Sequence, residues 1–85
     1  SATYQAQFIA KEDGPIKSVA DFAGKKLAFV DAASTSGYLL PLKLLNDRSV
    51  KPAETMFAGK HDNVVSMVYQ GQVDGGATFY SPPAD

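Results

Sequence analysis

The sequence contains no cysteine, and this absence excludes disulfide bonds, thiolate zinc sites and cysteine nucleophiles. Long apolar runs are also missing, since the longest reach only about six residues and a membrane-spanning helix needs roughly 20. Neither sign of charge dominates: eight Lys and Arg residues against nine Asp and Glu residues give a net charge of -1. We therefore do not expect nucleic acid or an anionic membrane surface as a partner.

What is present is the composition of one small folded domain. The 85 residues are 45% hydrophobic, 20% charged and 11% aromatic, as in packed soluble domains and unlike disordered or collagen-like chains. A chain of this length buries only about 60% of its unfolded surface, so it forms one small domain or part of a larger one. Because it begins Ser1-Ala2-Thr3 without Met, we interpret it as a mature or excised piece of a longer protein.

Strand and helix patterns alternate along the chain. Period-two alternation and short apolar runs predict four strands, the second and third of them buried, at 4–11, 26–30, 55–58 and 73–80. Helical spacing and capping residues predict helices near 18–22, 36–46 and 61–70. This order predicts an α/β domain of three layers, with a mostly parallel sheet and helices on both faces. Pro41 lies beyond the first turn of the helix predicted at 36–46, the longest before residue 60, so we expect that turn to be distorted.

Two loops lead from predicted strands into helix starts, where free N–H groups and a partial positive charge attract anions. If the strands are parallel neighbours, both loops lie at the carboxyl edge of the sheet. The first loop offers hydroxyl groups and a glycine that lets the backbone approach closely, and the second brings an imidazole to a helix start. Tyr80 ends the last strand at the same edge. A tetrahedral oxyanion fits the resulting donor set, which is Ser34, Thr35, Ser36 and His61, with Tyr80 as a side wall.

Plainer interpretations of the same residues remain open. Ser and Thr are common helix N-caps, a single histidine near a helix start is often solvated, and Gly75-Gly76 can mark a bulge. Ser36, His61 and Asp62 are the residue types of a hydrolase, but the G-x-S-x-G turn is missing and adjacent residues do not place a carboxylate behind the ring. One histidine without a spaced acidic cluster does not make a metal site, and no phosphate-loop or dinucleotide motif occurs. We expect a protein that is not an enzyme and has no cofactor.

Two motifs in combination resemble a known family. The run Ser-Thr-Ser-Gly-Tyr at 34–38, with Pro41 behind it, is followed by Gly-Lys-His-Asp at 59–62. Together with 16–30 and 71–85, these motifs resemble the phosphonate-, phosphite- and phosphate-binding proteins of ABC importers. The resemblance covers nearly all 85 residues. It implies that residues 1–85 are a single partial domain, the second lobe of a two-lobe protein of the type II periplasmic binding fold, with the first lobe absent.

The resemblance also implies a function. Such a protein captures a phosphorus oxyanion in the periplasm and delivers it to the permease of an ABC transporter, without an enzymatic step. The alternative is a ligand-sensing domain of the same fold that signals to a membrane protein. By position, residues 34–36 correspond to the family's helix-start donors and His61 to its imidazole ligand. Tyr80 lies near the strand-end residue that varies with the substituent on phosphorus.

Two further expectations concern specificity and assembly. Amino-acid-binding proteins of this fold hold a carboxylate with a bidentate arginine, and the only arginine here, Arg48, follows the longest helix, away from both loops. The sequence does not choose among phosphate, phosphite and phosphonate. A sheet that ends at Tyr80 without a further strand and helix leaves one edge and one apolar face uncovered, so we expect the chain to form a homo-oligomer.

Overall fold

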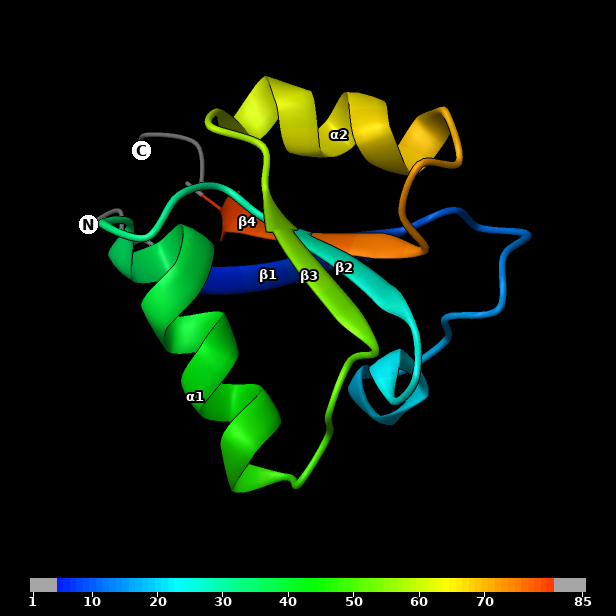
Figure 1. Ribbon diagram of the computed structural model, residues 1–85, viewed down its shortest axis with the longest axis horizontal. Helices are drawn as coiled ribbons and strands as arrows, with labels where there is room; N and C mark the ends of the chain where they lie inside the picture. The colour runs from blue at the N-terminus through cyan, green and yellow to red at the C-terminus, as the bar shows by residue number, and fades with distance from the viewer. Residues whose placement is uncertain (1–4, 81–85) are drawn as a thin grey trace, which may run out of the picture.

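A four-stranded sheet is the centre of the computed structural model, which describes residues 5–80 (Figure 1). The strands are β1 (Gln5–Ala10), β2 (Lys26–Phe29), β3 (Glu54–Phe57) and β4 (Gly75–Tyr80), in the spatial order β1-β4-β2-β3. β2 pairs in parallel with both β3 and β4, and β1 runs antiparallel to β4. The mostly parallel sheet predicted from the sequence is confirmed. The carboxyl ends of β2, β3 and β4 therefore share one edge.

Helices cover both faces of this sheet. Figure 1 shows α2 (His61–Tyr69) on one face, with α1 (Leu40–Asp47) and the short 3-10 helix η1 (Val19–Phe22) on the other. Each face has its own apolar cluster. The cluster below α1 and η1 is Ile16, Phe22, Leu27, Phe29, Leu45, Val50 and Ala77, and the cluster below α2 is Ala28, Val30, Val64, Val68 and Val73. The three layers expected from the alternating pattern are confirmed.

Glycines in β4 let the helices lie close to the sheet. A Cβ atom on Gly75 would lie 2.5 Å from Cε1 of Phe22, and one on Gly76 would lie 2.4 Å from Cγ1 of Val64. The two glycines continue a regular ladder, opposite Ala10 and Ile9 of β1. The bulge that we considered is therefore wrong, because these glycines serve packing on the two faces of one strand.

Two expectations about the sheet are corrected. The run 55–58 predicts a buried strand, but β3 is an exposed edge strand because it pairs with β2 alone. The last strand is not at the open edge, because β1 returns antiparallel along it and leaves β4 inside the sheet. The edges of the described sheet are β1 and β3. No helix within residues 5–80 is long and apolar enough to cross a membrane.

The turn before α1 is distorted, as Pro41 predicts. Residues Thr35–Leu39 form a π-helical turn, η2, in which Leu39 N donates to Ser34 O at 3.1 Å. Pro41 has no N–H with which to reach the carbonyl of Gly37 four residues earlier. That carbonyl instead accepts from Val30 N at 3.1 Å, just after the end of β2. The missing helical bond is thus replaced by one that ties the start of the helix to the sheet.

Candidate functional site

Val30 joins the two loops that the sequence analysis singled out. Its N–H donates to the carbonyl of Gly37, and its carbonyl accepts from Gly59 N at 2.7 Å. Ala58 N donates to Phe29 O at 2.8 Å, which extends the pairing of β2 with β3. The first helix start (residues 34–37) and the second helix start (residues 59–62) are therefore anchored to the same strand end. β2 and β3 are parallel neighbours, which is the condition under which both loops lie at the carboxyl edge of the sheet.

The first helix start is held by its own side chains and backbone. Ser34 is the N-cap, and its Oγ accepts from Gly37 N at 2.9 Å. The loop before it is closed by Asp31, which accepts from Ala33 N through Oδ1 at 2.8 Å and from Ser34 N through its carbonyl at 3.1 Å. A Cβ atom on Gly37 would lie 2.7 Å from both Val30 Cβ and Ser34 Oγ. Only glycine fits at this point.

This arrangement leaves backbone donors at the start of the turn. The first N–H groups of a helix have no carbonyl of the same helix to bond, and here the first backward bond of η2 is made by Leu39. Thr35 and Ser36 are the first two residues of η2, and the side chain of Thr35 is exposed. The side chains of Ser36 and Tyr80 lie outside the part of the chain that the structure describes. The N–H groups at 35–36 are thus the first backbone donors of this turn.

The second helix start places an imidazole at the same edge. Gly59 has φ +92°, a left-handed conformation that suits glycine, and the chain then enters α2 at His61. Asn63 Nδ2 donates to Ala58 O at 3.0 Å and closes this turn. The ring of His61 is half-buried, and its Nδ1 contacts Oγ1 of Thr78 in β4. The ring is therefore held between the start of α2 and the carboxyl half of β4.

Sequence reasoning missed Thr78, although a signal existed. Thr78 is the one polar residue in the run Gly-Gly-Ala-Thr-Phe at 75–79, and it is 1% exposed. Alternate residues of a strand share a face, so Thr78 lies on the face of Gly76, against which Val64 of α2 packs. A hydroxyl buried on the face that receives a helix needs a partner, and the first residue of that helix supplies one.

Aromatic rings pack beside this edge. Tyr38 lies edge-on to Phe29 and to Phe57, with ring centroids 5.0 Å apart in each pair. Phe57, at the end of β3, is 52% exposed, and Tyr38 is partly buried. Tyr38 thus packs on the apolar cluster below α1, as its helical spacing with the leucines indicated. At the start of α2, the exposed Lys60 precedes His61.

The arrangement does not support the hydrolase that we considered. In a Ser-His-Asp triad a carboxylate holds Nδ1 of the histidine, whereas here Nδ1 contacts the hydroxyl of Thr78. Asp62 is exposed in the first turn of α2. Within residues 5–80, no three His, Asp or Glu side chains lie close enough together to hold a metal ion. The groups that the structure describes at this edge are backbone N–H groups, the Ser34 hydroxyl and the His61 imidazole.

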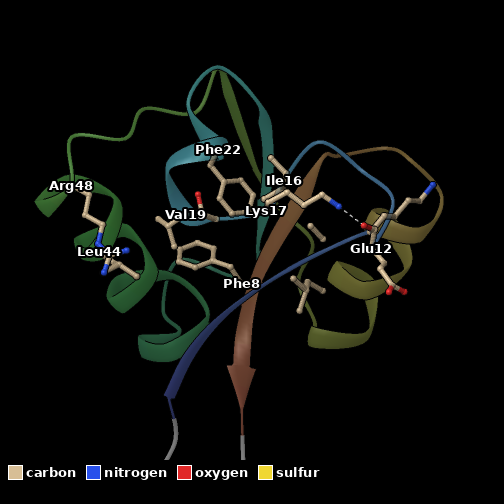
Figure 2. Close-up of a pocket in the computed structure, with 12 residues that line it drawn as sticks. Phe8, Glu12, Ile16, Lys17, Val19, Phe22, Leu44 and Arg48 are labelled. Atoms are coloured by element: carbon tan, nitrogen blue, oxygen red, sulfur yellow. Dashed lines mark hydrogen bonds between the residues drawn. The ribbon is translucent and has the colours of Figure 1, made fainter.

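A cavity lies at the opposite end of the sheet. It has a volume of about 750 Å³ and is lined by the carboxyl half of β1, by η1 and by the end of α1. Figure 2 shows the rings of Phe8 and Phe22 beside one another in this cavity, and Lys17 Nζ donating to the carbonyl of Glu12. The two ring centroids lie 5.2 Å apart, with the ring planes tilted by 43°. Arg48, just after α1, also lines this cavity, at the far end of α1 from η2. Among the predicted site residues with described side chains, Ser34, Thr35 and His61 do not line it.

Comparison with known proteins places the chain in a family. Residues 1–82 match the family described as "ABC transporter, phosphonate, periplasmic substrate-binding protein". The chain belongs to this family. A relative of this phosphonate-binding family, the "Phosphate-import protein PhnD" of Mycolicibacterium smegmatis, is 37% identical over 89% of this chain. The family assignment made from residues 34–41 and 59–62 is confirmed.

Solved structures support the same fold. XAC2383 from Xanthomonas citri matches with a TM-score of 0.83 in its ATP-bound structure and 0.85 in its chloride-bound structure, at 29% identity over 89% of this chain. An ancestral arginine-binding protein bound to arginine matches less closely, with a TM-score of 0.57 and 28% identity over 92% of this chain. The three-layer α/β fold is therefore that of one lobe of a periplasmic binding protein. The chain covers 27% of the length of PhnD and 32–33% of the lengths of these solved chains.

Proposed function

We propose that this chain supplies half of a binding site for a phosphorus oxyanion in the substrate-binding component of an ABC uptake transporter. The proposal rests on the two backbone hydrogen bonds of Val30, one to Gly37 and one to Gly59. Together they anchor both helix starts to one strand end. Two helix N-termini at one sheet edge present N–H donors and partial positive charge to the same space. A tetrahedral anion with several oxygens suits such a donor set.

Each expected site residue has a specific role in this proposal. The N–H groups of Thr35 and Ser36 bind one face of the anion, and His61 binds it from the second helix start. Ser34 keeps a donor for the anion, because its oxygen accepts from Gly37 N while its own hydroxyl proton remains to be donated. The hydroxyls of Thr35 and Ser36 add further donors. Tyr80 ends β4 at the same edge and closes one side of the site.

The nature of the anion follows from the donors. A carboxylate ligand favours a bidentate arginine, but Arg48 lies at the far end of α1 and lines the cavity of Figure 2. The relative PhnD is named for phosphate import, and a structure of XAC2383 holds ATP, which also presents phosphate oxygens. We therefore propose phosphate, phosphite or a small phosphonate as the ligand.

The wider setting of this binding site is also a proposal. The chain would be the second lobe of a two-lobe protein that acts on the periplasmic side of the cytoplasmic membrane and delivers its ligand to a permease. The lobe would bind its ligand without changing it chemically. Since the chain covers about a third of its solved relatives or less, the other lobe would supply the remaining contacts.

Phosphorus NMR of the ligands tests this proposal. We expect the 31P signals of methylphosphonate, phosphite or phosphate to broaden in the presence of the 85-residue chain, with a dissociation constant of about 1 mM or weaker for half a site. Excess glutamate, added as a carboxylate competitor, should not reverse the broadening. His61→Ala should remove most of it, while Lys17→Ala, in the cavity of Figure 2, should not. Broadening that survives His61→Ala and disappears in Lys17→Ala would place the anion in the other cavity and contradict the proposal.

A further inference from the structure

At the second helix start, the imidazole ring of His61 contacts the side chain of Thr78 in β4. Its Oγ1 lies against Nδ1 of His61, 17 residues earlier in the chain. Thr78 is 1% exposed, and no buried side-chain nitrogen or oxygen among the described residues lacks a hydrogen-bond partner. A buried hydroxyl that lost this bond would be costly, so the contact is a stable part of the fold.

The surroundings of Thr78 explain why the contact forms there. β2 pairs with β4 only through Leu27 and Ala28, opposite Gly75 and Gly76. Beyond that point β4 continues to Tyr80, and both η2 and α2 contact it. Thr78 thus lies past the last pair of the β2–β4 ladder, on a strand that both η2 and α2 contact.

The two nitrogens of the ring have different roles. A neutral imidazole has one N–H and one acceptor nitrogen, whereas a hydroxyl donates or accepts. The oxygen of an ionised phosphonate only accepts, so the ring nitrogen that meets it needs a proton. With Nδ1 against Thr78, that nitrogen is Nε2. Nδ1 of the neutral ring is then the acceptor, and Thr78 is the donor.

We propose that Thr78 is a positioning residue for anion binding: its hydroxyl donates to Nδ1 of His61, fixes the ring orientation and keeps the proton on Nε2. The inference rests on the proposed function, because it concerns the ring that would bind the anion. The second torsion of a histidine side chain is broad and nearly two-fold, so a partner on one nitrogen decides which nitrogen faces the site. If the ring takes up a second proton, Nδ1 donates to the same oxygen and the contact persists with its direction reversed.

Nitrogen NMR of the ring tests the direction of the bond without any ligand. His61 is the only histidine in the sequence, so the ring signals need no assignment by mutation. In alkaline buffer, where the neutral ring is observed, we expect Nδ1 to be an unprotonated acceptor and Nε2 to bear the proton. Because this measurement uses the unmodified chain, it decides the question even if a Thr78 variant does not fold. A proton on Nδ1 of the neutral ring would overturn the proposal.

Three variants then test the consequence for binding. Thr78→Val keeps the shape and removes the hydroxyl, and we expect it to move the Nδ1 signal toward that of an unbonded nitrogen and to weaken methylphosphonate binding roughly 3- to 10-fold. Thr78→Ser should restore both readouts. Thr55→Val is the matched control on the exposed strand β3 and should change neither.

The outcomes separate this proposal from the proposed function. Unchanged ring signals and unchanged affinity in Thr78→Val would overturn the positioning role. Failure of Thr78→Ser to restore the ring signals would overturn it as well, because it would trace the effect of Thr78→Val to packing. Ring signals as expected, with no response of the unmodified chain to methylphosphonate, would support the Thr78 bond and contradict the proposed function instead.

Discussion

The two helix starts meet at Val30 but are stabilised in different ways. The first depends on bonds within ten residues of sequence: Val30 N donates to Gly37 O, Gly37 N to Ser34 Oγ, and Leu39 N to Ser34 O. The second depends on distant parts of the chain, since the ring of His61 contacts Thr78 and the helix behind it packs through Val64 on Gly76. One half of the site is therefore a local turn, and the other half is a product of sheet packing.

This difference decides which perturbations reach which half. A change in the α2–β4 contact should move the imidazole and leave the amides of the first helix start in place. A change inside the turn at 34–37 should do the reverse. Val30 is the connection through which a disturbance of one side reaches the other.

The largest expected effect comes from Gly76→Ala. The new methyl group would lie 2.4 Å from Cγ1 of Val64, so α2 has to move away from β4. We expect the free energy of unfolding to fall by about 1–3 kcal/mol, as for other overpacked cores, measured by urea denaturation. The ring signals of His61 should shift strongly, and the amide signals of Thr35 and Ser36 should shift little.

Gly14→Ala is the matched control for adding a methyl group. Its Cβ would lie 3.3 Å from the carbonyl of Lys11, far from both helix starts, and its effect should stay within about 0.5 kcal/mol. If Gly76→Ala destabilised the chain no more than Gly14→Ala, close packing of α2 on β4 would not be what holds the imidazole.

Gly37→Ala is expected to act on the first half of the site. The added Cβ would lie 2.7 Å from Val30 Cβ and from Ser34 Oγ, which forces the turn away from the strand end. We expect a loss of about 1–2 kcal/mol of unfolding free energy and displaced amide signals at 35–36. The contact between His61 and Thr78 should persist in the ring spectrum. A shift of the ring as large as that in Gly76→Ala would mean that the two halves are not separately stabilised.

Ser34→Ala is expected to have the smallest effect of the three. It removes the acceptor of the Gly37 N–H, and loss of a serine N-cap costs about 1 kcal/mol. Hydrogen exchange of the Gly37 amide should accelerate together with the loss of stability. Ser66→Ala, on the exposed side of α2, is the matched control and should leave both quantities nearly unchanged. Equal exchange rates at Gly37 in the two variants would contradict the cap.

Sequence reasoning succeeded where structure is local. Pro41 predicted the distorted turn because a missing N–H acts within four residues, and the apolar run at 26–30 predicted β2 because both its faces are buried. It failed where the answer depends on which strands become neighbours. The exposure of β3, the antiparallel return of β1 and the pairing of Thr78 with His61 all follow from the order β1-β4-β2-β3. Local patterns do not specify that order.

A single titration tests most directly whether the two helix starts form one site. Methylphosphonate is added to the isotopically labelled chain, and the amides of Thr35 and Ser36 are followed together with the ring of His61. The account predicts that all of these signals move along one binding curve with one dissociation constant. Different dissociation constants for the two helix starts, or the largest shifts at Lys17 and Arg48 in the cavity of Figure 2, would contradict it.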